Sequence, residues 1–334
     1  MRQNETDEQY MRRCLQLARR GRLGAAPNPM VGAVAVCEGR IIGEGFHQRC
    51  GEAHAEVNAI RSVREEDRPL LRRSTLYVSL EPCAHYGKTP PCAQLIIDTG
   101  IPHVVVGCRD PFARVDGRGI TMLREAGVEV REGVLEEECR RLNRRFITFH
   151  TLHRPYITLK WAQSEDGFID RRRESPEEPP VHFSTPTTQA LVHQLRAGHE
   201  AILVGRRTWE LDRPSLTVRH WHGRSPLPVV LSSSPVGNET NGTTTPPHTP
   251  PLVYGDPKAA AAGLWERGVQ SLLVEGGAQT LQSFINAGLW DEIRVETAPL
   301  HLETGIQAPH PPAAVSETFR IDGNRIDVYR KTSE

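Results

Sequence analysis

The sequence has little net charge, no long apolar run and few cysteines. Its 334 residues carry 41 Lys and Arg against 41 Asp and Glu, so the formal net charge is zero. A protein that binds nucleic acid usually presents an excess of positive charge. No apolar run approaches the roughly 18 residues that a membrane-spanning helix needs. We therefore expect a small-molecule substrate, with neither nucleic acid nor a membrane as partner.

The seven cysteines are too few for a disulfide scaffold in a chain of this length, and their number is odd. The N-terminal segment MRQNETDEQYMRRCLQLARRG lacks the apolar core of a signal peptide. Both absences favour a cytoplasmic enzyme whose cysteines are available to a metal or to chemistry. At about 150 residues per domain, the length predicts two domains.

In the first half, apolar spacing predicts helices that alternate with strands. A hairpin is expected over residues 30–46, with Glu38-Gly39 at its turn. The other expected strands are 75–81 and 103–107, and the expected helices are 8–20, 54–63, one opened by Pro90-Pro91, 118–127 and 135–149. This alternation predicts a layered α/β domain with a mixed sheet.

A second series of strands and helices begins at residue 155. Its expected strands are 155–162, 201–205, 228–233, 271–277 and 292–298, and its expected helices are 186–197, 257–267 and one ending near residue 287. A polar, Pro-rich loop is expected over 237–251. We therefore divide the chain into domains 1–150 and 151–334, each of the α/β class.

One ordered set of residues in the first half points to a metal. His54-Ala55-Glu56 is followed by Pro82-Cys83 and then by Cys92. One histidine and two cysteines can supply three zinc ligands and leave the fourth position to water, whose pKa the ion lowers toward neutrality. Glu56 can then move protons without binding the metal, as in the H-x-E and P-C signature of zinc nucleobase deaminases.

Each of these residues alone has a plainer interpretation, as a helix-capping histidine, a surface glutamate or a core cysteine. Their order, and their expected place at two helix starts, favour the metal site. The spacing is unusual, because eight residues separate the two cysteines where such deaminases generally have two. The longer loop offers His85, Lys88 and Thr89 to a substrate phosphate or base. The other five cysteines, Cys14, Cys37, Cys50, Cys108 and Cys139, are interpreted as packing residues.

The first half resembles the deaminase domain of the bifunctional riboflavin-biosynthesis deaminase/reductases. The resemblance is carried by PNPMVGAV (27–34), GEGFHQRCGEAHAEVNAI (43–60) and LEPCAHYGKTPPC (80–92), and it continues to LNRRF (142–146). It implies a cytidine-deaminase-like three-layer fold, in which His54, Cys83 and Cys92 bind zinc and Glu56 transfers protons. It also implies that Asn28, His47 and Lys88 contact the substrate, although Asn28 alone would be read as a turn former and Lys88 as a solvated loop charge.

The second half resembles the reductase domain of the same family. The matching segments are TLKWAQSEDGFI (158–169), LRAGHEAILVGRRTWELDRPSLTVR (195–219) and LLVEGGAQTLQSFI (272–285). The resemblance implies a dihydrofolate-reductase-like fold and NADPH as cofactor. No G-x-G-x-x-G follows the first strand, so a Rossmann domain is not expected.

Residues along both ligands of the reductase follow from this resemblance. The implied NADPH contacts are Ala162, His182, Thr208, Asp212, Ser233, Gly277, Ala278, Gln279, Thr280, Leu281, Gln282 and Ser283. The implied substrate contacts are Arg196, Leu216, Arg219 and Glu275. Lys160 on the first strand is a further candidate, which could orient the open-chain imine or polarise the sugar; an ordinary lysine of an amphipathic strand is the alternative. Arginine suits a phosphorylated sugar because it binds phosphate through two parallel hydrogen bonds; an exposed helix or loop charge is the alternative for each.

Gly276-Gly277 also has a physical interpretation of its own. A glycine pair after an apolar strand lets a phosphate approach the backbone, and a helix start beyond it offers free N–H groups. A simple turn is the alternative. The chain departs from the family where His182 stands in place of a usual tryptophan and where Asp212-Arg213-Pro214 replaces a pair of acidic or amide residues before the proline.

Together these observations predict a bifunctional enzyme with Zn²⁺ and NADPH as cofactors. It would deaminate a phosphoribosylated diaminopyrimidinone and then reduce the ribosyl group to a ribityl chain. We expect a homo-oligomer. One alternative is a deaminase of tRNA or another polynucleotide, which would call for a basic surface and no reductase half. The other is a deaminase whose second half is a non-catalytic binding or oligomerisation module, an alternative favoured only by the altered residues 180–185.

Overall fold

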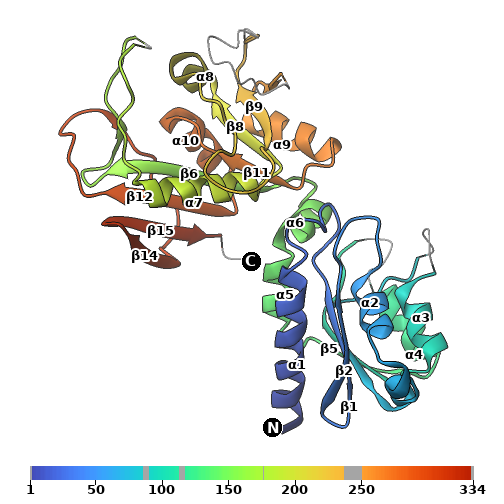
Figure 1. Cartoon of the computed structure of the whole chain (residues 1–334). Coiled ribbons are helices and arrows are strands. Elements are labelled where there is room, and N and C mark those ends of the chain that lie inside the picture. The colour runs from blue at the N-terminus through green and yellow to red at the C-terminus, as the bar shows by residue number, and fades with distance from the viewer. Residues whose placement is uncertain (1, 86–89, 113–116, 176, 237–249, 332–334) are drawn as a thin grey trace. The chain divides into compact units, whose positions relative to one another are not determined.

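The computed structural model describes residues 2–85, 90–112, 117–175, 177–236 and 250–331. The chain divides into two compact units, Met1–Leu152 and His153–Glu334 (Figure 1). This division lies two residues beyond the boundary expected from the sequence. Each unit has its own sheet and its own buried cores.

The first unit is built on a five-stranded mixed sheet in the order β2-β1-β3-β4-β5. Its strands are β1 (Gly32–Cys37), β2 (Arg40–Phe46), β3 (Thr75–Leu80), β4 (His103–Cys108) and β5 (Glu129–Glu132). Strand β1 runs antiparallel to β2 and β3, whereas β3, β4 and β5 are parallel. The expected hairpin is present, and its turn falls at Glu38-Gly39.

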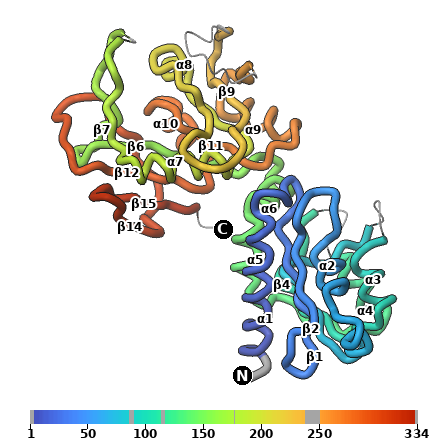
Figure 2. Tube along the Cα trace, viewed as in Figure 1, coloured from blue at the N-terminus to red at the C-terminus, as the bar shows by residue number. Residues whose placement is uncertain are grey.

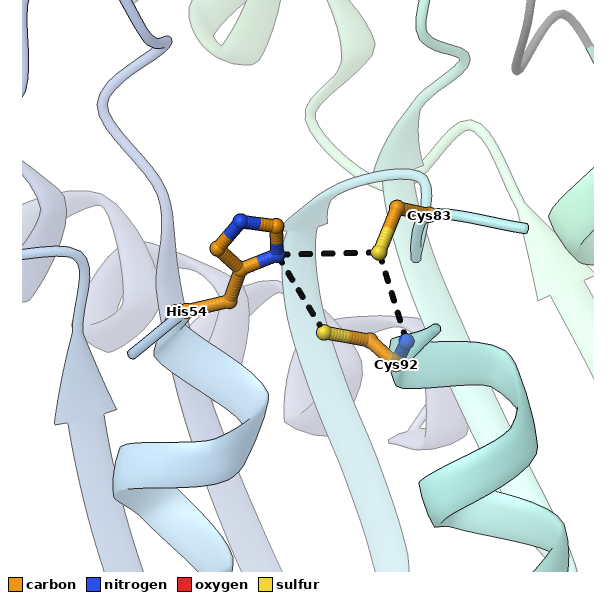
Figure 3. Close-up of side chains that lie close together, drawn as sticks. All are labelled: His54, Cys83 and Cys92. Atoms are coloured by element: carbon orange, nitrogen blue, oxygen red, sulfur yellow. Dashed lines mark hydrogen bonds between the residues drawn. The ribbon is translucent and has the colours of Figure 1, made fainter. Parts of the chain in front are cut away.

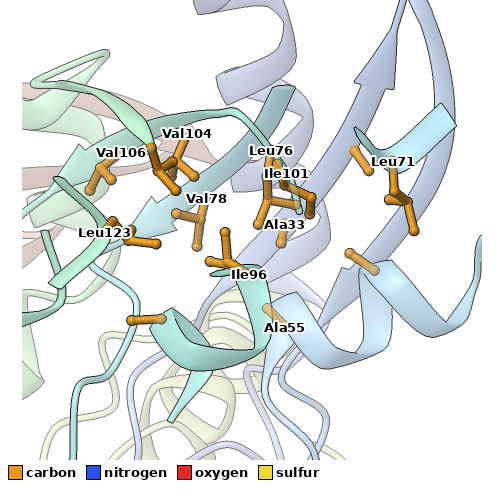
Figure 4. Close-up of a cluster of buried hydrophobic side chains, with 14 of the residues drawn as sticks. Ala33, Ala55, Leu71, Leu76, Val78, Ile96, Ile101, Val104, Val106 and Leu123 are labelled. Atoms are coloured by element: carbon orange, nitrogen blue, oxygen red, sulfur yellow. The ribbon is translucent and has the colours of Figure 1, made fainter. Parts of the chain in front are cut away.

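Helices cover both faces of this sheet. They are α1 (Arg2–Arg19), α2 (Ala55–Arg61), the 3₁₀ helix η1 (Glu65–Arg73), α3 (Cys92–Thr99), α4 (Arg118–Glu125), α5 (Glu136–Leu142) and α6 (Arg144–Leu152). Helices α1 and α5 pack on one face, and α2, α3 and α4 lie over the other (Figure 1). Side chains from the strands and from α2, α3 and α4 form the buried cluster in Figure 4. The result is a three-layer domain in which the starts of α2 and α3 lie on the same side of the sheet.

One expected helix is wrong. Residues 135–149 form two helices, α5 and α6, because the chain breaks at Asn143. The Asn143 side chain accepts from Met30 N at 2.8 Å and donates to Met30 O at 2.9 Å. An asparagine that bonds to distant backbone groups competes with helix continuation, and here it ties the break to the loop that carries Asn28.

The second unit is built on an eight-stranded sheet in the order β10-β9-β8-β11-β6-β12-β15-β14. Its strands are β6 (Tyr156–Ser164), β8 (Ala201–Gly205), β9 (Leu227–Leu231), β10 (Leu252–Tyr254), β11 (Ser271–Val274), β12 (Glu292–Ala298), β14 (Glu317–Ile321) and β15 (Asn324–Arg330). The strands from β10 to β12 are parallel, and β15 and β14 are antiparallel. A small second sheet pairs β7 (Phe168–Asp170) with β13 (Ile306–Gln307).

The helices of this unit are α7 (Pro186–Ala197), α8 (Arg206–Asp212), α9 (Pro257–Glu266) and α10 (Ala278–Asn286). Helices α9 and α10 contribute to the larger buried core, and a smaller cluster joins the other sheet face to Leu195 of α7. Strand β8 leads directly into α8 (Figure 1), and β11 leads through a short turn into α10 (Figure 2). A helix therefore begins at the carboxyl end of each of these two parallel strands. Ligands of open parallel sheets usually bind at the carboxyl ends of the strands.

Candidate metal centre and reductase cleft

The histidine and the two cysteines singled out in the sequence lie together in the first unit (Figure 3). His54 is the N-cap of α2, Cys92 is the first residue of α3, and Cys83 follows β3. The His54 Nδ1 atom lies 3.6 Å from Cys83 Sγ and 3.3 Å from Cys92 Sγ. All three candidate ligand atoms lie within 4.8 Å of one another.

This donor set fits a zinc ion. Tetrahedral zinc with Zn–N and Zn–S bonds of about 2.0 and 2.3 Å separates neighbouring N and S ligands by about 3.5 Å. Both measured N–S distances lie close to this value. Three protein ligands leave the fourth position of the tetrahedron to water or substrate, the arrangement of catalytic zinc sites.

The surroundings favour a thiolate at Cys83. Its sulfur accepts from the Cys92 backbone N–H at 3.3 Å, at the start of α3. Hydrogen bonds from the Cys92 thiol and from His54 lower the pKa of Cys83 to about 4, despite its burial. The hydrogen bond to Cys83 raises the pKa of His54 to about 9, so binding of a metal at Nδ1 releases a proton from this ring. A deprotonated cysteine is the form that binds metal.

Glu56 is buried beside this centre, with only 3% of its surface exposed. It lies in the first turn of α2 and interacts with the Cys92 thiol. Burial, followed by the charge of Cys83, raises the pKa of Glu56 to about 7. A carboxyl group with a pKa near the working pH can both take up and release protons.

Two of the three residues implied to contact the deaminase substrate meet beside His54. Asn28 Nδ2 lies 3.1 Å from His47 Nε2, and His47 Nδ1 lies 3.1 Å from Ala53 O. The His47 and His54 rings are edge-to-face, with centroids 5.4 Å apart. Lys88 and Thr89 lie outside the described residues.

The cysteines outside this centre do not all match their interpretation. Cys14, Cys37, Cys108 and Cys139 are buried, as expected of packing residues. Cys50 is exposed. It lies in the turn region after β2, where its backbone N–H bonds to Gly24 O, and it belongs to none of the buried clusters.

Glu81 is a buried residue whose role the sequence analysis missed. Its carboxylate accepts backbone N–H groups of four residues, Asp110, Gly117, Gly119 and Ile120, at 2.9 to 3.3 Å. A Cβ at Gly119 would lie 1.9 Å from Pro82 O, so only glycine permits this close packing. Glu81 thereby fixes the segment that leads to Cys83. Its place directly before the Pro82-Cys83 motif was the available signal.

In the second unit, a cavity of about 940 Å³ opens at the carboxyl ends of β8 and β11, where α8 and α10 begin. The predicted residues that line it are Lys160, Ala162, Thr208, Asp212, Ser233, Glu275, Gly277, Ala278, Gln279 and Thr280. They come from four separate stretches of the chain. Its volume lies within the range of about 300–1,000 Å³ that is typical of small-molecule and cofactor sites.

Several residues implied to contact NADPH lie elsewhere. Leu281 is fully buried in the core, since it faces the sheet from α10. Gln282 bonds to Asn286 on the exposed side of α10, and Ser283 bonds to Thr280 O. His182 is exposed and does not line the cavity, whereas its neighbour Phe183 does.

The glycine pair forms the turn between β11 and α10. A Cβ at Gly276 would lie 3.0 Å from both Gly205 N and the Thr280 side chain, so glycine lets the two helix starts approach each other. Gly277 is the N-cap of α10, and its N–H donates to Thr208 Oγ1 at 3.2 Å. The expected helix start near Ala278 is present.

Ion pairs hold most of the charged side chains around this cavity. Arg196 binds Glu275 through two hydrogen bonds of 3.0 and 2.6 Å, and Lys160 Nζ lies 3.7 Å from Glu296. The charge of Arg196 lowers the pKa of Glu275 although burial opposes this. All three nitrogens of Arg196 are engaged, because Nη1 donates to Thr217 O.

Asp212 is also paired, with a residue that the sequence analysis did not select. Arg173 is buried and donates to Asp170 Oδ2 at 2.7 Å and to Asp212 Oδ1 at 2.5 Å. The only sequence signal for Arg173 was its place in the arginine run 171–173 before α7.

Arg219 is exposed and lies on the segment 215–219, which follows α8. Its guanidinium contacts the hydroxyls of Ser215 and Thr217. Leu216 is 3% exposed and packs in the smaller core cluster, so its side chain anchors this segment rather than facing the cavity.

Comparisons with known proteins agree with both halves of this picture. The zinc-binding region of cytidine and deoxycytidylate deaminases matches residues 4–108, and the RibD C-terminal domain matches residues 155–303. The chain is 38% identical over 328 residues to riboflavin biosynthesis protein RibD of Aquifex aeolicus, covering 90% of this chain and 89% of that protein. The protein of the same name from Bacillus amyloliquefaciens is 38% identical over 332 residues, covering 91% of this chain and 87% of its own length.

The solved structure of a diaminohydroxyphosphoribosylaminopyrimidine deaminase/5-amino-6-(5-phosphoribosylamino)uracil reductase from Thermotoga maritima is also similar. It has a TM-score of 0.85 and 35% identity, and the match covers 99% of this chain and all of that one. The expected fold class is thereby confirmed.

A zinc-binding deaminase domain followed by a reductase domain defines a bifunctional enzyme that uses zinc and NADPH. The chain belongs to the RibD family, the deaminase/reductases of riboflavin biosynthesis. Within the described ranges, no helix is long and apolar enough to cross a bilayer.

Proposed function

We propose that this chain converts the two substrates named for its Thermotoga relative. It would first deaminate diaminohydroxyphosphoribosylaminopyrimidine and then reduce 5-amino-6-(5-phosphoribosylamino)uracil. The observation that carries the first step is the meeting of His54, Cys83 and Cys92 beside a buried Glu56. The cavity around Gly276-Gly277 supports the second step.

In the deaminase half, His54, Cys83 and Cys92 would hold the zinc ion. When bound, zinc lowers the pKa of a coordinated water toward neutrality. Glu56 would take a proton and pass it to the departing amine nitrogen, because its carboxyl group is adjacent to the centre but is not one of its ligands. Asn28 and His47 would orient the pyrimidine, and Lys88 remains a predicted contact.

In the reductase half, the residues around the Gly276-Gly277 turn would hold NADPH. Ala162, Thr208, Asp212, Ser233 and the first turn of α10 line the cavity and are the supported part of the predicted set. The roles predicted for the side chains of His182, Leu281, Gln282 and Ser283 gain no such support.

The substrate phosphate would bind Arg219 rather than Arg196. Arg196 already uses its three nitrogens on Glu275 and Thr217, whereas the Arg219 side chain is exposed beside two hydroxyls. Lys160 and Glu275 line the cavity and would face the sugar.

One incubation tests both steps. Purified protein would receive the diaminopyrimidine phosphate with or without NADPH, and both ammonia release and NADPH consumption would be followed. We expect ammonia in both samples, and NADPH consumption only after deamination. Ammonia release without NADPH consumption would favour the alternative in which the second half is a non-catalytic binding or oligomerisation module. Deamination of tRNA or another polynucleotide, with none of the pyrimidine phosphate, would favour the alternative of a polynucleotide deaminase. The homo-oligomeric state and the cytoplasmic location stay predictions.

A further inference from the structure

We propose that His193 is a positioning residue of the reductase. It would act with Arg196 to clamp the segment 215–219 so that Arg219 is presented to the substrate phosphate. The proposal rests on the proposed function, because it takes Arg219 as the phosphate-binding residue.

His193 and Arg196 lie three residues apart on α7 and therefore share a helix face. His193 Nδ1 accepts the Arg219 backbone N–H at 3.0 Å. Arg196 Nη1 donates to Thr217 O at 3.2 Å. The helix thus binds the backbone of the segment at two residues, 217 and 219. It donates one hydrogen bond through Arg196 and accepts the other through His193.

The same arginine connects this clamp to the cavity. Its remaining nitrogens bind Glu275, which lines the cavity just before the glycine turn. The segment that carries Arg219 is therefore linked through α7 to the end of β11. A displacement of the segment would therefore move the exposed Arg219 guanidinium relative to the cavity.

The chemistry of His193 suits a permanent acceptor. Its surface is 2% exposed, and its ring meets that of His220 edge-to-face with centroids 4.7 Å apart. The titratable groups that act on it are Arg196, His220, Arg219 and Glu275. Burial and then the charge of Arg196 lower its pKa to about 4. Nδ1 therefore stays unprotonated at neutral pH, with the proton on Nε2.

The segment 215–219 also contains a strained backbone conformation, which the hydrogen bonds to α7 help to hold. Leu216 has a φ of 51°, in the left-handed region that a residue with a Cβ rarely adopts. Conformations of this kind persist only where several contacts determine them together. Here the contacts are the burial of the Leu216 side chain and the two hydrogen bonds between the segment and α7.

The central test compares His193→Leu, which removes the acceptor, with His193→Gln, whose side-chain oxygen can accept in its place. His193→Leu should raise KM for the deaminated substrate about 5- to 10-fold, the effect of one lost hydrogen bond. A phosphate contact remote from the reacting carbon contributes to binding in ground and transition states alike, so kcat should change little. His193→Gln should restore most of the KM. Ammonia release and NADPH affinity should be unchanged in both.

Two further variants locate the effect. His222→Leu, an exposed histidine nearby, is the matched control and should leave KM unchanged. Adding His193→Leu to Arg219→Ala should raise KM no further, because the clamp acts through Arg219. An additive effect, or a normal KM in His193→Leu beside a raised KM in Arg219→Ala, would overturn the positioning role. A normal KM in Arg219→Ala would instead overturn the phosphate assignment, and an inactive wild-type reductase would overturn the proposed function.

A spectroscopic readout keeps the proposal testable if His193→Leu fails to fold. In wild-type protein with ¹⁵N-labelled histidine, assigned by the signal missing from His193→Gln, the Nδ1 of His193 should show the shift of an unprotonated acceptor from pH 8 to 5.5. A proton on Nδ1, or titration near the ordinary histidine pKa of about 6.5, would contradict the acceptor role.

Discussion

At the scale of single residues, the metal centre separates binding from proton transfer. Glu56 is buried next to Cys92 but does not belong to the cluster of candidate ligand atoms. Glu56→Gln keeps the size of the side chain and removes its ability to exchange a proton. We expect full zinc content, with deamination reduced at least about 10²- to 10⁴-fold, the usual contribution of a general acid–base. Zinc per chain and ammonia release measure the two effects, and near-normal ammonia release would place the proton transfer elsewhere.

The cysteine ligands should behave in the opposite way. Cys83→Ser or Cys92→Ser replaces a thiolate by a hydroxyl that does not ionise at neutral pH, so zinc content and ammonia release should fall together. Cys50→Ser is the matched control, because this cysteine is exposed and is not part of the ligand cluster. Metal analysis after gel filtration provides the measurement. Full zinc occupancy in both ligand variants would refute the assignment.

The sequence anticipated this site well because its chemistry restricts residue types as well as spacing. His-x-Glu, Pro-Cys and a later cysteine in this order, with helix starts expected at the histidine and at the later cysteine, are typical of a metal site and would seldom occur together by chance. The supporting residues were harder to foresee. Glu81, His193 and Arg173 act through contacts with backbone groups or carboxylates distant in the chain. The partners in these contacts cannot be read from the local sequence, although Glu81 stands next to the Pro82-Cys83 motif and Arg173 ends an arginine run.

At the scale of elements, the turn between β11 and α10 is the part of the reductase that a single Cβ can disturb. Gly277→Val would place a Cβ about 3.3 Å from Thr208 Oγ1, at the cavity wall formed by the start of α10. We expect NADPH affinity to fall at least about tenfold, because the approach of a cofactor phosphate to this helix start is blocked. Deamination should be unchanged.

Titration of NADPH by its fluorescence measures this effect. Ala262→Val, at an exposed position of α9, is the control for adding a branched side chain to the same unit. Unaltered NADPH binding by Gly277→Val would show that the cofactor phosphates lie away from this turn.

The elements themselves were predictable to different degrees. The central strands β3, β4, β8 and β11 are short buried apolar runs, and their local pattern suffices. The antiparallel pair β14 and β15 was missed because β14 lies at the sheet edge and is largely exposed, which leaves little apolar alternation. The Asp322-Gly323 turn between them was the signal available. The break at Asn143 depends on a contact with Met30, 113 residues away.

At the scale of the whole molecule, the two activities belong to units that do not share a core. Both buried clusters of the first unit lie within residues 1–152, and those of the second lie within 153–334. A unit of about 150 residues buries enough surface to fold alone. Every described residue of the metal centre also lies in the first unit.

A fragment of residues 1–152 should therefore fold, bind about one zinc ion and release ammonia from the diaminopyrimidine phosphate without NADPH. It ends after α6, so it keeps the bonds of Asn143 to the loop that carries Asn28. The matched comparison is a fragment that ends at residue 142, which should lose deamination because those bonds are removed. Circular dichroism, zinc content and ammonia release would be measured for both. An unfolded or inactive 1–152 fragment beside an active full chain would mean that the deaminase depends on the second unit. Equal activity of the two fragments would show that α6 and Asn143 do not support the substrate loop.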